Sequence, residues 1–89
     1  MKTIKIELGI DTATVDETVN EEKYKKLVIK SLREQLPDYR LSCSVNQDDN
    51  AETHILNADD FQPDIVLEIE EALVEAEPGA INDPDIYES

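Results

Sequence analysis

Several residue types that build catalytic and ligand sites are scarce in this sequence. Its 89 residues include no Trp, one Phe, three Tyr, two Gly, one Cys and one His. Two Gly are too few for a Gly-rich loop that cradles phosphates. A single Cys and a single His exclude an internal disulfide and cannot form a zinc cage within one chain.

This scarcity argues against an enzyme. Cys43 lies on the inward-facing side of a predicted strand, where a free Cys packs as a small apolar residue and is not an activated nucleophile. Acid–base pairs can be chosen almost anywhere among 22 Asp and Glu residues, so no pair stands out. Few aromatic residues are available to line a substrate cleft. We therefore expect no catalytic residue and no cofactor.

One oxygen-rich segment invites a metal interpretation. Asp48, Asn50, Glu52 and Asp59 follow the spacing of a calcium-binding loop. The sixth position of such a loop needs Gly for its sharp turn, and this sequence has Thr53 there. The helix that normally precedes the loop is also missing from the pattern. We interpret the segment as a turn and expect no specific metal site.

Lys and Arg are absent from the second half of the chain, which contains His54. Residues 1–40 contain all eight Lys and Arg and eight Asp and Glu, whereas residues 41–89 contain fourteen Asp and Glu. The net charge of -14 therefore comes entirely from the second half. Such a charge repels phosphates, so it argues against direct binding to nucleic acid or an anionic membrane and favours a basic protein partner.

Long apolar runs are also absent, and no stretch approaches the length that spans a bilayer. Lys5 and Glu7 interrupt the apolar start of the sequence, so we expect no signal peptide. A single Cys suits a reducing compartment. These features together predict a cytoplasmic protein.

The first half of the sequence has the pattern of strand, helix and strand. Apolar residues alternate with polar ones over 3–10 and again over 39–46, which predicts two strands with polar outer faces. The helix between them begins near Thr18 or Asn20 and ends before Pro37. This order favours parallel strands, with the helices on one face of the sheet. Residues 53–57 are a candidate third strand, paired as a hairpin with the second.

The second amphipathic segment covers residues 63–77, with Pro63 at an early position and Pro78-Gly79 after its end. Its apolar face is predicted to contain Ile65, Val66, Ile69, Ala72, Leu73 and Ala76. The predicted fold is a small α+β two-layer sandwich in β-α-β-(β)-α order. We expect a single compact domain at 1–78 and an acidic, flexible tail at 79–89, which Ile81, Ile86 and Tyr87 could still pin. A chain that ends at Pro78 is expected to stay folded.

The polar surface of the second helix carries only acidic residues, among them Glu70 and Glu77. Three- and four-residue spacing places a subset of them on one ridge, and Leu67 and Val74 are predicted to lie exposed on this helix, nearly opposite its core face. Acidic residues of the preceding loop extend the candidate surface. The candidate partner-binding residues are Asp64, Glu68, Glu71, Glu75, Asp48, Asp49, Asp59, Asp60, Leu67 and Val74.

The outer side of the first helix has the opposite charge. Lys23, Lys26, Lys30 and Arg33 fall within one narrow stripe. The ordinary interpretation of this stripe is a solvated face that keeps the helix soluble. The alternative is a docking surface for an acidic partner, including the second half of another copy.

These features favour a noncatalytic protein that binds a basic surface on another protein. In the most concrete form, its carboxylates replace phosphates in the groove of a DNA- or RNA-handling protein. In charge and size alone, the sequence is similar to the small acidic inhibitors that phages use against restriction, repair or CRISPR nucleases. One alternative is a structural or assembly subunit that forms a weak homodimer through the basic stripe and the acidic helix. Another is an antitoxin or immunity protein that neutralises a basic toxin.

Overall fold

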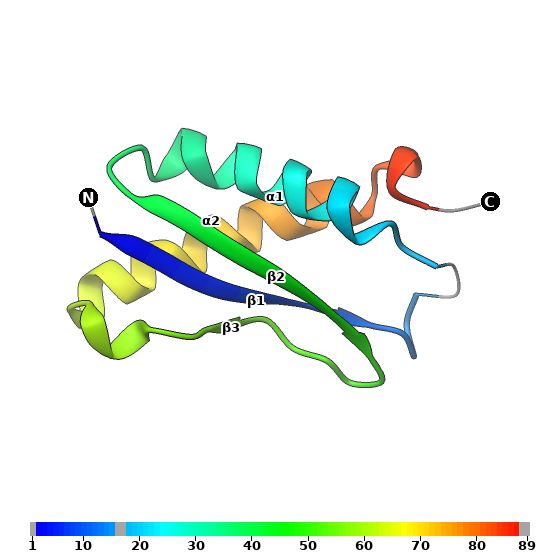
Figure 1. Ribbon diagram of the computed structural model, residues 1–89, viewed down its shortest axis with the longest axis horizontal. Coiled ribbons are helices and arrows are strands. Elements are labelled where there is room, and N and C mark those ends of the chain that lie inside the picture. The colour runs from blue at the N-terminus through cyan, green and yellow to red at the C-terminus, as the bar shows by residue number, and fades with distance from the viewer. Residues whose placement is uncertain (1, 16–17, 88–89) are drawn as a thin grey trace.

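A computed structural model describes residues 2–15 and 18–87 of the chain. Its elements are β1 (Thr3–Asp11), α1 (Glu21–Gln35), β2 (Arg40–Asp48), β3 (His54–Ile55), η1 (Ala58–Asp60), α2 (Pro63–Ile81) and η2 (Pro84–Ile86). The strands form one sheet in the order β2-β1-β3, and α1 and α2 run antiparallel to each other (Figure 1). This arrangement confirms the predicted small α+β fold.

Local signals explain where α1 and β1 lie. Every inward residue of the alternating β1 pattern is buried, which makes β1 the centre of the core. The side chain of Asn20 accepts a hydrogen bond from the backbone N–H of Lys23 at 3.2 Å, so Asn20 and not Thr18 caps α1. Helix α1 ends at Gln35, two residues before Pro37, whose ring disfavours helical backbone before it.

Strands β1 and β2 are parallel, as predicted, and they are neighbours in the sheet, with a continuous register from Thr3↔Arg40 to Asp11↔Asp48. β2 is an edge strand, because β1 has β2 on one side and β3 on the other. Its inward apolar residues are only partly buried, since an edge strand has a neighbour on one side alone. These residues are Leu41, Cys43 and Val45.

The predicted hairpin between the second and third strands is wrong. β3 pairs antiparallel with β1, through Ile6↔Ile55 and Glu7↔His54. The connecting loop crosses to the far side of β1 at Gly9, where a Cβ atom would lie 2.4 Å from the carbonyl carbon of Glu52. Only a glycine leaves room for this close approach.

Side chains replace most of the ladder between β1 and β3, which explains why β3 has only two residues. The hydroxyl of Thr53 accepts a hydrogen bond from the Gly9 N–H at 3.0 Å. The amide side chain of Asn57 accepts from the Lys5 N–H and donates to the Thr3 carbonyl, at 2.9 and 2.8 Å. Such pairing depends on contacts across more than forty residues of sequence, as from Gly9 to Thr53.

Helix α2 continues beyond its predicted end to Ile81. Pro78 lacks the N–H that would bond the carbonyl of Val74. Val74 lies on the solvent-exposed side of α2, where water can bond the freed carbonyl. The last turn is held by Ala80, which is buried. The loss of one hydrogen bond therefore does not end the helix. Among the described residues, no helix is long and apolar enough to cross a membrane.

The segment predicted as a flexible tail is packed against the rest of the fold as far as Tyr87. Ile86 is 0% exposed and belongs to the hydrophobic core. Its carbonyl accepts a hydrogen bond from the Asn20 N–H at 2.6 Å, and Tyr87 forms an antiparallel bridge with Val19. The expected boundary at residue 78 therefore falls inside the packed structure. Residues 88 and 89 lie outside the described part of the chain.

Candidate functional site

Four carboxylates form a continuous ridge on α2, called here the acidic ridge. Its residues are Asp64, Glu68, Glu71 and Glu75, and all are exposed. A second side of α2 is buried through Ile69, Ala72, Leu73, Ala76 and Ala80. Because these contacts fix the helix on the core, the acidic ridge is presented on a rigid support.

The acidic ridge runs beside the C-terminal end of α1. Glu68, Glu71 and Glu75 border an open hollow of about 280 Å³ together with Gln35 of α1 and Leu36, which caps its C-terminus. No Lys or Arg lines this hollow among the described residues. The negative charge of the ridge is therefore not neutralised where the two helices meet.

Two apolar side chains lie next to the acidic ridge on the solvent side of α2. Leu67 is 54% exposed and Val74 is 72% exposed, which confirms the predicted exposure of this pair. They are separated by seven residues, so they lie on one line along the helix. A partner that docks on the ridge would meet this apolar line as well.

The structure separates the loop carboxylates into two groups. Asp59 and Asp60 belong to η1, directly before the ridge, and the backbone carbonyl of Asp60 accepts a hydrogen bond from Lys2 Nζ at 2.9 Å. Asp48 and Asp49 lie where β2 ends, at the opposite end of the molecule from the start of α2 (Figure 1). The first pair lies just before the acidic ridge in the chain, whereas the second pair lies far from it (Figure 1).

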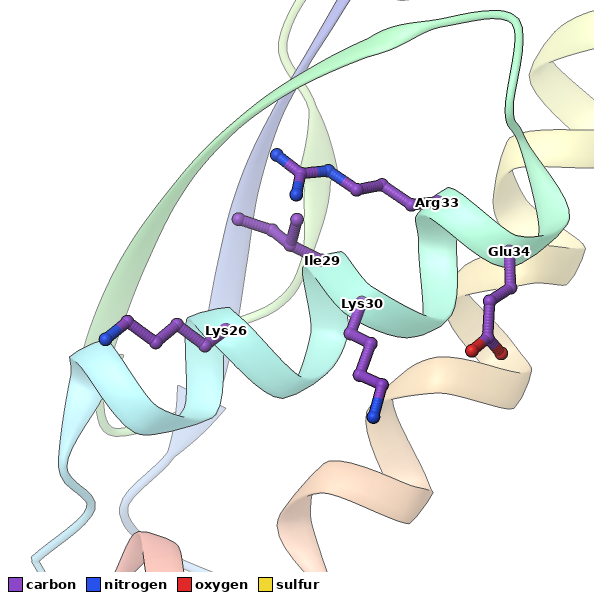
Figure 2. Close-up of a pocket in the computed structure, with 5 residues that line it drawn as sticks. All are labelled: Lys26, Ile29, Lys30, Arg33 and Glu34. Carbon is purple, nitrogen blue, oxygen red and sulfur yellow. The ribbon is translucent and has the colours of Figure 1, made fainter.

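The basic stripe of Lys23, Lys26, Lys30 and Arg33 is exposed along α1. Three of these residues line an open hollow of about 440 Å³ with Ile29 and Glu34. Figure 2 shows Ile29 and Arg33 pointing to one side of α1, and Lys30 and Glu34 to the other. Within the described residues, the one ion pair joins Lys25 to Glu22 at 3.2 Å, so the stripe and the ridge are not paired with each other.

Glu77 differs from the surface carboxylate that the helix pattern predicts. It is half-buried, and its Oε2 accepts hydrogen bonds from Thr53 Oγ1 at 2.8 Å and from the Tyr24 hydroxyl at 3.4 Å. Burial raises the pKa of Glu77, and the two hydrogen bonds act in the opposite direction. Burial and the adjacent carboxylate also raise the pKa of Tyr24. Glu77 therefore joins α1, α2 and the loop before β3, and it is not available to a partner.

Replacing Glu77 with Gln is expected to raise the free energy of unfolding more at about pH 7 than at about pH 4. A raised pKa means that the folded state binds the proton more tightly than the unfolded state. The contribution of Glu77 to stability is therefore fully present at low pH and falls as the pH rises through the folded pKa. Gln stays neutral and can still accept from Thr53. Urea unfolding of both proteins at the two pH values measures the difference, and an equal gap at both would contradict the assignment.

Cys43 is partly buried on the edge strand β2. Burial raises the pKa of its thiol, although Lys25 and Arg33 act in the opposite direction, so the neutral thiol is favoured. In the part of the chain that the structure describes, no three His, Cys, Asp or Glu side chains are placed to hold a metal ion.

The acidic ridge, its apolar line and the basic stripe are thus three exposed features that a partner could contact. No protein-family model, curated protein or solved structure matches this chain.

Proposed function

We propose that this chain is a noncatalytic binding protein whose acidic ridge docks on a basic surface of another protein. In its most concrete form the target is a groove that otherwise holds DNA or RNA. The observation that carries this proposal is the placement of four exposed carboxylates on one side of a packed helix. The described residues supply no ion-pair partner to any of them.

The spacing of these carboxylates is comparable to that of phosphates. From Asp64 to Glu75 the helix rises about 16 Å, at about 1.5 Å per residue, so the three intervals between successive charges average about 5.5 Å. Each strand of duplex DNA carries one charge per about 3.4 Å of helix axis. Lys and Arg side chains that bind successive phosphates could therefore reach successive carboxylates of the ridge.

The rest of the chain supports the same kind of partner. A net charge of -14 on 89 residues produces a negative field that attracts a basic protein and speeds its encounter. Nucleases, restriction enzymes and repair proteins carry basic grooves of the required kind, and a phage-type inhibitor of such an enzyme would act in the cytoplasm. A basic toxin would present a surface of the same charge. An immunity protein that neutralises such a toxin would therefore dock through the same acidic ridge.

Capture of the partner from the host, followed by competition with nucleic acid, tests this function. The purified target is loaded with a fluorescent DNA duplex or RNA hairpin, and the acidic protein is titrated in. We expect the nucleic acid to be displaced, and the affinity of the acidic protein to fall as salt rises, because charge complementarity supplies much of the attraction. A target that holds nucleic acid and the acidic protein together would rule out mimicry.

A further inference from the structure

The outer edge of β2 has no neighbouring strand within the described chain. β2 contains nine residues, whereas β3 at the other edge of the sheet contains two. The Arg40 N–H bonds the Lys2 carbonyl, and the Thr12 N–H bonds the Asp48 carbonyl. Alternate residues of a parallel strand bond the same neighbour, so the even-numbered residues of β2 face β1.

The odd-numbered residues of β2 therefore direct their backbone groups away from the sheet. These residues are Leu41, Cys43, Val45 and Gln47. Their N–H and C=O groups have no hydrogen-bond partner among the described residues. A row of eight such groups along one strand is a template for pairing with another strand.

The usual protections against edge pairing are missing from β2. It contains no Pro, its register with β1 is continuous and so has no bulge, and it has no charged residue between Arg40 and Asp48. The strand as a whole is neutral, in a chain whose net charge is -14. The edge of β2 is thus a place where a second acidic copy can approach at short range.

We propose that β2 pairs antiparallel with β2 of a second copy, about a two-fold axis at Ser44. Leu41 then pairs with Gln47 of the second copy and Cys43 with its Val45, so that all eight free backbone groups are bonded. On the outer face Arg40 lies opposite Asp48 of the second copy, and this ion pair occurs at both ends of the ladder. The two sheets become one sheet of six strands.

The charges select this register over its neighbours. A two-fold axis at Cys43 places Arg40 opposite Asn46 and leaves Asp48 unpaired. An axis at Val45 places Asp48 opposite Ser42 and leaves Arg40 unpaired. Only the axis at Ser44 pairs both charged residues and all four odd-numbered residues, and it brings Ser42 opposite Asn46 and Ser44 opposite itself.

Salt dependence separates this dimer from association of the basic stripe with the acidic ridge. Two copies of charge -14 repel each other, and salt screens that repulsion. Pairing through backbone hydrogen bonds of a neutral strand should therefore strengthen as salt rises. Docking of the stripe on the ridge depends on opposite charges and should weaken as salt rises.

Disulfide trapping tests the register directly. Residues opposite each other at the two-fold axis form a non-hydrogen-bonded pair, whose Cα atoms are about 4.5 Å apart and can be bridged. In a Cys43→Ala background, Ser44→Cys is expected to form a covalent dimer under mild oxidation. Ser42→Cys is the matched control. In the proposed register, residue 42 of one copy lies four residues along the strand from residue 42 of the other, so this variant should stay monomeric. Equal trapping at both positions, or none at Ser44→Cys, would overturn the proposal.

Sedimentation at several salt concentrations provides the second measurement. The Arg40→Asp variant is expected to dimerise about tenfold more weakly, because both end pairs become repulsive. Adding Asp48→Lys to Arg40→Asp reverses the pairs and should restore the dimer. Edge pairing would be refuted if the protein is monomeric at every concentration. It would also be refuted if association weakens as salt rises and Arg40→Asp leaves the association unchanged. Neither measurement involves the acidic ridge or its target, so the proposed function stands or fails separately.

Discussion

Neutralising the acidic ridge is expected to abolish binding to the basic target while the fold survives. The variant carries Asp64→Asn, Glu68→Gln, Glu71→Gln and Glu75→Gln. Each lost charged contact in a partly desolvated groove costs about 1–3 kcal/mol, so four together remove about 4–12 kcal/mol, a large part of the roughly 8–12 kcal/mol that binds a micromolar to nanomolar complex. The four residues are exposed, and size and helix propensity change little. Titration calorimetry measures the binding, and circular dichroism monitors the fold.

A control variant with the same change in net charge separates the acidic ridge from total charge. Its substitutions are Glu34→Gln, Asp38→Asn, Glu52→Gln and Glu70→Gln. These residues are also exposed, and their side chains take part in no hydrogen bond or ion pair within the described chain. We expect the control to bind with slightly reduced affinity. Equal losses in the two variants would show that net charge, and not the placement of the ridge, attracts the target.

Substitutions in the apolar line beside the acidic ridge distinguish an interface held mainly by charge from one held mainly by apolar contacts. Replacing Leu67 and Val74 with Ser should weaken binding less than the ridge variant if the target is a nucleic-acid groove. A larger loss would indicate an apolar interface with a charged rim.

Removal of residues 79–89 is the second change with a large expected effect, and it should unfold most of the protein. The deletion removes Ile86 and Ala80 from the core, together with the hydrogen bond from the Asn20 N–H to the Ile86 carbonyl. Ile86→Ala alone is expected to cost about 2–5 kcal/mol, against a total of about 5–15 kcal/mol for a small domain. Urea unfolding followed by circular dichroism measures both variants.

Leu56→Ala is the matched control for this prediction. Leu56 is 60% exposed, so its removal opens no cavity and should leave the unfolding midpoint nearly unchanged. A truncated chain as stable as the full one would contradict a contribution of Ala80 and Ile86 to the stability of the core.

Short-range patterns in the sequence determined the two helices, the two long strands and the acidic ridge. Side-chain direction in a strand or helix follows from a period of two or 3.6 residues, so Ile4 and Ile6 had to share a face, as did Glu68 and Glu71. The cap at Asn20 and the stop at Pro37 are equally local. The exposure of Leu67 and Val74 followed from the same period.

Only the tertiary structure decided which strand β3 joins, that β2 has an open edge, that Glu77 is half-buried and that Ile86 completes the core. Each depends on residues far apart in sequence, such as Gly9 with Glu52 or Glu77 with Tyr24 and Thr53. The five residues between β2 and β3 do not encode on which side of β1 the chain passes, because either path satisfies the local turn. The choice depends on the space left at Gly9 and on the hydrogen bonds that Thr53 and Asn57 make there, and these exist only once β1 is in place.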